Sequence, residues 1–186
     1  MIEFETKESM PRKVLIYGED GTGKSTFAAK YCEKHGLKAV VVDVDKTNFT
    51  DVPSVKIDLS NHIKATRNME SLIKELADND NYDTIIIDGI DSLLANLESN
   101  DSGLARYNAR AKNFQKILNS LLTSNLNLIM IGQIIIKVVE NNEVQPNKQF
   151  VKINSFVNEK YKTVRTGNNI DNFKYSYEIE KFRGNI

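Results

Sequence analysis

The chain has 186 residues, and its 25 Lys and Arg residues balance its 25 Asp and Glu residues, so the formal net charge is zero. A hydrophobic fraction of 40% and a charged fraction of 27% are typical of a globular domain and exclude disorder of the whole chain. The composition also excludes a generic polycation and a disulfide-rich scaffold, because Cys32 is the one cysteine. We therefore expect a reducing, cytoplasmic environment and no membrane association, since the longest apolar run, at 128–136, is far too short for a span.

The first two-thirds of the chain alternates buried strands with amphipathic helices. The strands are predicted from short, continuous apolar runs, the pattern of a strand that is covered on both faces. The helices are predicted from apolar residues three or four positions apart. This order favours an α/β fold with a mainly parallel central sheet flanked by helices. The predicted strands are 14–17, 39–42, 55–59, 84–88 and 126–131, and the predicted helices are 26–34, 69–76 and 104–122.

From Ile134 onward, short strand-like pieces are separated by turn residues. That pattern predicts β-hairpins appended to the α/β core. We expect a single domain over 1–186, with a core at about 11–133 and a β-rich extension at about 134–186. The predicted strand-like pieces of the extension are 134–139, 150–153, 160–164 and 175–179, with turns at 141–142 and 166–169.

The segment between the first predicted strand and the first predicted helix carries a phosphate-binding motif. Residues 18–25 read GEDGTGKS, which fits Gly-x4-Gly-Lys-Ser/Thr. Its glycines allow a loop to wrap a phosphate, and backbone N–H groups and the following helix N-terminus attract the anion. We expect Lys24 to reach the β and γ phosphates of ATP and Ser25 to hold Mg²⁺. An incidental glycine-rich turn is the alternative. The predicted nucleotide-binding residues are Gly18, Glu19, Asp20, Gly21, Thr22, Gly23, Lys24, Ser25 and Thr26.

Acidic residues at strand ends are the candidates for metal binding and catalysis. Asp88 ends a fully apolar strand, where a charge is costly to bury unless something uses it, so we expect it beside Mg²⁺. A strand-end Asp that caps the next turn or helix is the alternative. The next residue is Gly89, so the Glu that follows this acid in many ATPases is absent. Asp43 and Asp45 end another strand, and alternation sends them to opposite faces. We assign Asp45 as the carboxylate that orients the attacking water; two solvated strand-end acids are the alternative.

Two further polar residues follow predicted strands. Gln133 lies after the strand at 126–131, at the crevice where α/β sheets bind ligands, and is expected to sense the γ-phosphate. An ordinary strand-end Gln is the alternative. Asp91 is expected to cap the segment at 93–97 rather than to act on the ligand.

In their order along the chain, these motifs resemble the core of RecA-type ATPases. That family has a D-x-E element after its second strand with the Glu as catalytic acid, and Asp45 matches the Glu with a side chain one methylene shorter. A strand that ends in Gln is also typical of the family. Residues 181–184, KFRG, resemble the K-x-R-x-G element in which a Lys and an Arg reach the γ-phosphate of a neighbouring subunit. The resemblance implies such roles for Lys181 and Arg183.

The tail also has a strand pattern of its own. Lys181 and Arg183 share the odd-numbered positions with Tyr175, Tyr177 and Ile179, so all five are predicted on one face of a strand. A cationic pair would then follow an apolar face, suited to stabilising phosphoryl charge in a neighbouring subunit. Two solvated C-terminal charges are the alternative.

The compact length and the entry sequence PRKVLIYG, at 11–18, resemble small phage nucleotide-binding proteins of the Sak type. Those proteins are minimal RecA-like ATPases linked to single-strand annealing and recombination. The resemblance covers about 11–184. It implies a phage-type protein in the bacterial cytoplasm that self-associates into a ring or filament, binds single-stranded DNA and hydrolyses ATP with Mg²⁺ in a DNA-stimulated way. A single-strand-binding protein or a helicase is the implied protein partner.

In RecA-type proteins the DNA-contacting loops follow the acid-bearing strand and the polar-ended strand. The corresponding segments here are about 96–110 and 134–152, where cations are interleaved with aromatic rings, a pattern that suits a single strand. A solvated helix face and a surface hairpin are the alternatives, because acidic residues dilute both segments. The predicted DNA-binding residues are Arg106, Arg110, Lys137 and Lys148.

Other functions stay open at this point. One is an ATPase of the helicase or helicase-loader class whose main target is a protein. Another is a nucleotide switch with negligible hydrolysis. A small-molecule kinase is disfavoured because only Arg106, Arg110 and Arg165 lie between the acid-bearing strand and the tail, too few for an arginine-rich lid. Specificity for GTP is disfavoured because the chain has no N-K-x-D motif.

Overall fold

The computed structural model describes residues 10–47, 49, 51–133, 137–140, 143–146, 148–167 and 172–182. In chain order, the strands of this part are β1 (Lys13–Tyr17), β2 (Ala39–Asp43), β3 (Thr84–Asp88), β4 (Asn127–Gly132), β5 (Lys137–Glu140), β6 (Glu143–Pro146), β7 (Glu159–Thr166) and β8 (Lys174–Phe182). Its helices are α1 (Lys24–His35), α2 (His62–Ala77), α3 (Ile90–Asn96), α4 (Leu104–Thr123) and α5 (Lys148–Phe156).

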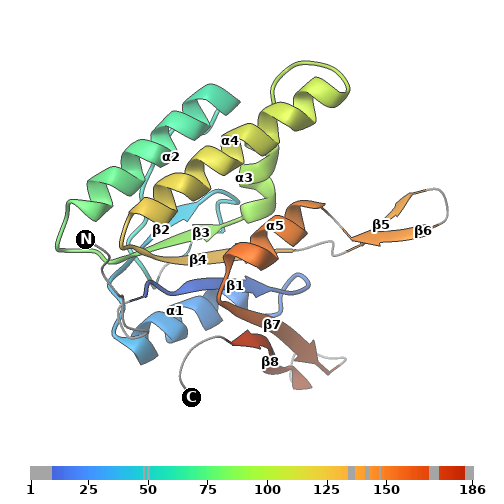
Figure 1. The fold of residues 1–186 in the computed structure, drawn as a ribbon. Helices are drawn as coiled ribbons and strands as arrows, with labels where there is room; N and C mark the ends of the chain where they lie inside the picture. The colour runs from blue at the N-terminus through green and yellow to red at the C-terminus, as the bar shows by residue number, and fades with distance from the viewer. Residues whose placement is uncertain are drawn as a thin grey trace, which may run out of the picture.

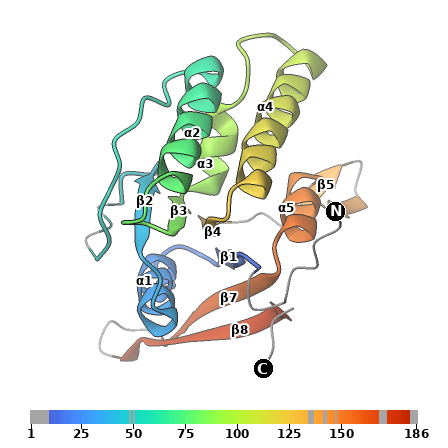
Figure 2. The same cartoon turned by 60° about the vertical axis from the view of Figure 1, so that its left-hand side comes forward.

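Six strands form the central sheet in the order β2-β3-β4-β1-β7-β8. All neighbouring pairs from β2 to β7 are parallel, and β8 is antiparallel at the edge. The helices α2, α3, α4 and α5 lie over one face of the sheet, and α1 lies under the other (Figures 1 and 2). The predicted α/β class with a mainly parallel sheet is confirmed.

Two hydrophobic cores follow from the alternation of side chains along the strands. In β1, Leu15 faces the core beneath α2 to α5, whereas Val14 and Ile16 face the core over α1. Cys32 of α1 lies in that second core at 4% exposure, and burial raises the pKa of its thiol to about 11. Full burial of one large aliphatic side chain stabilises a fold by roughly 1.5–3 kcal/mol, so the continuous apolar strands anchor the sheet between its helices.

Most elements of the first two-thirds match their predictions. The predicted strands at 14–17, 39–42, 84–88 and 126–131 are β1 to β4, and the predicted helices are α1, α2 and α4. The strand predicted at 55–59 is wrong. The chain there makes only one isolated bridge, between Val41 and Ser54, and its apolar side chains pack partly buried against the first core.

The C-terminal third differs more from the prediction. The hairpin β5–β6 is antiparallel, and β7–β8 form a second antiparallel pair. However, β7 pairs in parallel with β1, so this pair extends the central sheet instead of being appended to it. The strand predicted at 150–153 is wrong, because this segment lies in α5. Ile153 and Val157, four positions apart, are both buried, and so short an apolar run does not separate a helix from a strand.

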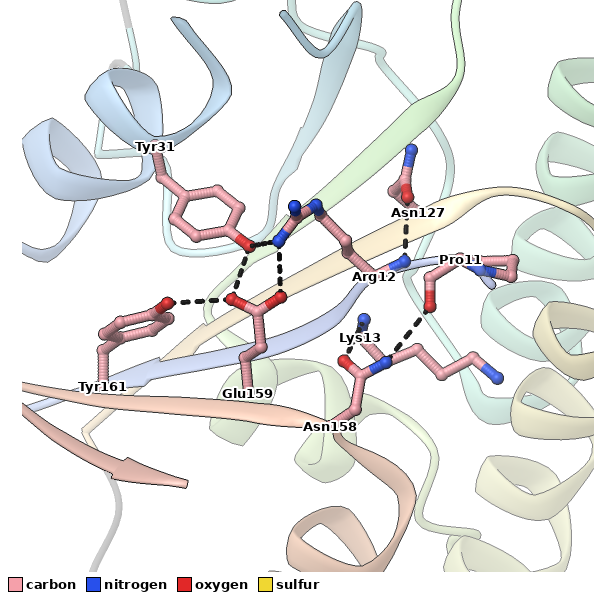
Figure 3. A network of polar contacts seen from close by, with 8 residues as sticks. All are labelled: Pro11, Arg12, Lys13, Tyr31, Asn127, Asn158, Glu159 and Tyr161. Atoms are coloured by element: carbon pink, nitrogen blue, oxygen red, sulfur yellow. Dashed lines mark hydrogen bonds and ion pairs between the residues drawn. The ribbon is translucent and has the colours of Figure 1, made fainter. Parts of the chain in front are cut away.

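A buried carboxylate fastens β7 to β1 and α1 (Figure 3). The side chain of Glu159 is 4% exposed and accepts hydrogen bonds from Arg12 at 2.7 Å, from Tyr31 at 2.6 Å and from Tyr161 at 2.8 Å. Burial, reinforced by the hydrogen bonds to Glu159, raises the pKa of both tyrosines, which therefore stay protonated as donors. We call Glu159 and these three donors the Glu159 clamp.

None of the helices in the described part of the chain combines the length and the apolar character needed to span a bilayer.

Candidate functional site

The predicted phosphate-binding loop connects β1 to α1. Gly21 and Gly23 have φ angles of 68° and 79°, in the left-handed region that favours glycine. The loop curls around Lys24, whose Nζ donates to the carbonyl oxygens of Gly18 at 3.0 Å and Glu19 at 2.8 Å. Burial lowers the pKa of Lys24, although carboxylates nearby oppose that shift. The ammonium group therefore sits inside the loop, where a phosphate would replace the two carbonyl contacts with a negative charge.

The serine after Lys24 meets the acid that ends β3. Ser25 Oγ donates to Asp88 Oδ2 at 2.9 Å, and Thr47 Oγ1 donates to the same atom at 3.2 Å. Asp88 is 4% exposed, and burial raises its pKa, with smaller contributions from the charges of Asp43 and Asp45. A cation beside this carboxylate would offset that electrostatic cost. Hydroxyl and carboxylate oxygens are the ligands that Mg²⁺ prefers, so these residues fit a magnesium ion.

The carboxylate of Asp45 occupies the space into which a side chain at position 89 would extend. Gly89 has a φ of 96°, and a Cβ built on it would lie 2.5 Å from the Asp45 carboxylate. Asp43 is held by Thr47, whose backbone N–H donates to Asp43 Oδ1 at 2.9 Å. Of the two acids at the end of β2 and just after it, Asp45 is the one that lines the phosphate pocket, a hollow of about 270 Å³ over the loop and Asp88.

The end of β4 is tied to both sides of the phosphate pocket. The backbone N–H of Gln133 donates to Asp91 Oδ2 at 2.8 Å, and its side-chain amide donates to the carboxylate of Asp20 in the loop. Asp91 lies in the first turn of α3, whose cap position is Gly89, so its carboxylate holds β4 and does not cap the helix as predicted. Burial raises the pKa of Asp91, with the charge of Asp45 adding to the shift.

Lys181, the predicted tail residue that the structure describes, lies away from this pocket. Lys160 pairs with Lys181, but Tyr161 pairs with Ile179, so a bulge at Glu180 interrupts the alternation. The prediction that Lys181 shares a face with Tyr175, Tyr177 and Ile179 is therefore wrong. The Lys181 ammonium donates to the carbonyl oxygen of Asn154 in α5, on the other face of the sheet. Arg183 lies outside the described residues.

The predicted DNA-binding residues are only partly described. Arg106 and Arg110 of α4 both form ion pairs with Glu98, whose side chain is 9% exposed, and the Arg110 guanidinium lies 5.0 Å from the ring centre of Tyr107. Both arginines therefore brace the connection between α3 and α4. For Lys137 in β5 and Lys148 in α5, only the backbone positions belong to the described part of the chain.

Sequence reasoning missed two residues beside the loop. Thr47 contacts both Asp43 and Asp88, but it lies in a stretch without regular periodicity that gave no signal. Arg165 of β7 places Nη1 3.5 Å from the Gly21 carbonyl oxygen, and its guanidinium lies 4.5 Å from the ring centre of Phe173. That contact depends on the pairing of β7 with β1, which no local pattern indicates.

Comparisons with known proteins agree with this geometry. A family model described as an AAA domain matches residues 10–166, which is most of the chain. The chain belongs to the AAA domain family. It is a P-loop ATPase domain, and residues 18–25 are its P-loop. A search of the curated proteins finds no match.

Two solved structures are similar to the whole domain. The crystal structure of the RadB recombinase is 17% identical with a TM-score of 0.57, over 91% of this chain and 80% of that chain. The flagellar accessory protein FlaH from Methanocaldococcus jannaschii is 15% identical with a TM-score of 0.49, over 93% of this chain and 80% of that chain. The likeness to RadB confirms the predicted RecA-like fold.

Proposed function

We propose that this domain is a Mg²⁺-dependent ATPase in which Asp45 prepares the attacking water. The observation that carries the proposal is the meeting of four side chains from three segments of the chain at one pocket. The P-loop presents Lys24 and Ser25, β3 presents Asp88, and the segment after β2 presents Asp45 above Gly89. Ammonium, hydroxyl, metal-binding carboxylate and free carboxylate are the groups that phosphoryl transfer to water requires.

Each residue has one task in the proposed reaction. Lys24 exchanges its contacts with the loop carbonyls for the β and γ phosphates, and Ser25 and Asp88 hold the metal. Bound Mg²⁺ supplies positive charge to the phosphate oxygens. Asp45 accepts a proton from water as the water oxygen bonds to the γ-phosphorus and the bond to the β–γ bridging oxygen breaks, releasing ADP and phosphate. Gln133, which already contacts the P-loop through Asp20, senses the γ-phosphate.

For the target of this activity we propose single-stranded DNA, in recombination or annealing of the phage Sak type. Two observations support this target. The structure of similar fold is that of a recombinase, and the β5–β6 hairpin projects beyond the body of the domain after Gln133 (Figure 1). A change sensed at Gln133 has a short route along the chain to that hairpin, which carries Lys137. A ring or filament would allow Lys181 and Arg183 to act on the neighbouring subunit.

The test is ATP hydrolysis by the wild-type protein and by Lys24→Ala, each alone, with single-stranded DNA and with duplex DNA. We expect Mg²⁺-dependent hydrolysis that single strands stimulate and that Lys24→Ala abolishes. Hydrolysis by Lys24→Ala at the wild-type rate would contradict the assignment of the phosphate pocket as the ATP site. Hydrolysis that DNA leaves unchanged would contradict the proposed target while keeping the ATPase.

One observation favours a second candidate, an ATPase that acts on a protein partner such as a helicase. Glu98 forms ion pairs with both Arg106 and Arg110. These pairs reduce the positive charge that the start of α4 offers to DNA. Fluorescence anisotropy with a labelled single strand separates the candidates. If the protein acts on a helicase, we expect no DNA binding with or without ATP. If it acts in recombination, we expect ATP-dependent DNA binding that weakens in Lys137→Ala.

A further inference from the structure

The strand β8 forms one border of the central sheet, and its outer edge has no neighbouring strand within the described residues (Figure 2). Such an edge presents a row of backbone N–H and C=O groups that can pair with another strand. An exposed apolar row beside an open sheet edge is typical of an interaction surface. Of the nine large hydrophobic side chains that are exposed in the described part of the chain, four lie on this strand: Tyr175, Tyr177, Ile179 and Phe182.

Three of these side chains, Tyr175, Tyr177 and Ile179, form a row on the face of β8 toward α1, which we call the apolar row of β8. Ile179 pairs with Tyr161, which belongs to the core over α1. The ring of Tyr177 packs 4.7 Å from that of Phe27 in α1, measured between centres. The strand is thus fixed against the domain, yet the side chains of the row are 59%, 49% and 60% exposed in chain order.

The alternate positions of β8 carry charges on the opposite face of the sheet. Lys174, at the start of the strand, is exposed and forms no ion pair within the described residues. Toward the end of the strand, Glu178 pairs with Lys162 at 3.5 Å and Glu180 pairs with Lys160 at 2.6 Å. A cation at the start and acids toward the end make the strand complementary in charge to a second copy that runs in the opposite direction.

We propose that β8 pairs with β8 of a second copy of this chain, antiparallel and about a two-fold axis at Tyr177. In this register Lys174 of each copy lies opposite Glu180 of the other. Tyr175 lies opposite Ile179, and the two Tyr177 side chains lie opposite each other. Cross-strand pairs of opposite charge, and pairs of aromatic with aliphatic side chains, stabilise antiparallel strands. The two central sheets join into one sheet, and the apolar rows of both copies become continuous.

The neighbouring registers fit less well. An axis at Glu178 would set two carboxylates opposite each other, which is unfavourable. An axis at Ser176 would carry Ile179 past the partner strand, because β8 begins at Lys174. The axis at Tyr177 keeps the paired stretch, 174–180, within the strand and sets no like charges directly opposite each other.

A two-fold pairing closes on itself, because both copies use the same surface. It is therefore a different contact from the head-to-tail contact that a ring or filament repeats. The start of β8 lies next to the P-loop, since a Cβ on Gly23 would lie 3.5 Å from the ring of Tyr175. The interface would lie close to the P-loop of each copy, but its formation requires neither nucleotide nor DNA. The inference can therefore be tested independently of the proposed function.

Sedimentation velocity of the protein without nucleotide measures the pairing. We expect a dimer with a Kd on the order of 10 µM, since one pair of strands is a small interface. Ile179→Lys should raise this Kd about a hundredfold, because the two-fold axis places the unpaired charge in the apolar row twice. Lys174→Glu should raise it about tenfold, because it sets like charges opposite Glu180. Ile63→Lys is the matched control and should dimerise like the wild type, because Ile63 of α2 is 67% exposed and lies outside β8.

Cysteine crosslinking tests the register. Ser176 and Glu178 are both exposed, and the axis at Tyr177 sets each opposite the other in the second copy. We expect a disulfide between copies when Ser176→Cys and Glu178→Cys are mixed and oxidised with diamide, and much less with either variant alone. The native Cys32 is buried and should not contribute.

A wild-type protein that stays monomeric at concentrations well above this Kd would overturn the inference. So would a dimer that Ile179→Lys and Lys174→Glu leave intact, or a disulfide that forms as fast with Ser176→Cys alone as in the mixture. Circular dichroism confirms that each variant is folded, and Lys174→Glu alone decides if Ile179→Lys is not. Assemblies larger than a dimer that persist in both variants would place self-association on another surface and overturn the inference. Dimerisation without ATP hydrolysis would support it and contradict only the proposed function.

Discussion

Asp88 and Glu159 are both acids of the central sheet, at 4% and 3% exposure, yet their surroundings differ. Glu159 receives hydrogen bonds from Arg12 and from two tyrosines (Figure 3). Asp88 receives two hydroxyl hydrogen bonds and lies near two further carboxylates, and burial raises its pKa. A buried charge that is paired with a cation costs less to keep in the fold than a buried charge without a cation. The Glu159 clamp is therefore complete within the chain, whereas the phosphate pocket around Asp88 is one that a ligand completes.

The largest expected effect is at the phosphate pocket. Asp45→Ala should lower the rate of ATP hydrolysis about a thousandfold, the scale of a lost general base, because the water loses its proton acceptor. The affinity for ATP, measured by titration, should stay near the wild-type value. Asp45→Asn keeps the shape of the side chain and serves as the isosteric control. Hydrolysis at the wild-type rate in Asp45→Asn would show that another group prepares the water.

At the clamp, the expected loss is of stability and not of chemistry. Glu159→Ala leaves the Arg12 guanidinium and two tyrosine hydroxyls without their shared acceptor, so the free energy of unfolding should fall by about 3 kcal/mol. Urea denaturation followed by circular dichroism measures the change. Glu178→Ala is the control, because Glu178 forms an exposed pair with Lys162 at 3.5 Å and should change stability by less than about 0.5 kcal/mol. Equal unfolding midpoints for Glu159→Ala and the wild type would show that the Glu159 clamp does not stabilise the fold.

A smaller effect is expected where α3 holds the end of β4. Asp91→Ala removes the acceptor for the Gln133 backbone N–H, so Gln133 should lose its position over the P-loop, and kcat/KM for ATP should fall about tenfold. Asp91→Asn keeps an oxygen acceptor and should restore most of the activity. If Asp91→Asn were as impaired as Asp91→Ala, the negative charge of Asp91 and not its hydrogen bond would be what the site needs.

The smallest effect has the opposite sign. Since burial raises the pKa of Asp88 in the folded protein, its ionised form opposes folding at neutral pH. Asp88→Asn should therefore be slightly more stable than the wild type at pH 7 without Mg²⁺, although it should not hydrolyse ATP. That advantage should shrink as the pH falls through the folded-state pKa, because the wild-type carboxyl is then neutral as well. Thermal unfolding of both proteins across this pH range measures the difference in stability. If Asp88→Asn were less stable than the wild type at pH 7, the ionised Asp88 carboxylate would stabilise the fold, as Glu159 does.

The parts predicted from sequence share a physical property, which is that their signal is local. The P-loop is eight consecutive residues, and each of the first four strands of the sheet is a continuous apolar run. Asp45, Asp88 and Gln133 were found because each follows such a run, and parallel strands bring their carboxyl ends to one edge. The phosphate pocket is therefore a consequence of motifs that are readable one at a time.

The parts that were mispredicted or missed depend on contacts between distant segments. The bulge at Glu180 reverses which face Lys181 occupies, and no composition signal marks it. The ion pairs of Arg106 and Arg110 with Glu98 also join α4 to the preceding connection, and the DNA-binding role of the two arginines stays a prediction. The contact between Arg165 and the P-loop depends in the same way on the pairing of β7 with β1, which no local pattern indicates.

The burial of Cys32 has a practical consequence for labelling. It is the one cysteine in the chain, and at neutral pH its thiol, with a pKa near 11, is almost entirely protonated and shielded by the core over α1. Maleimide dyes react with the thiolate, so the native chain should resist modification. A second cysteine placed on an exposed surface would then take a single fluorophore without removal of the first, which makes distance measurements by energy transfer between the edge strand and a labelled nucleotide directly accessible.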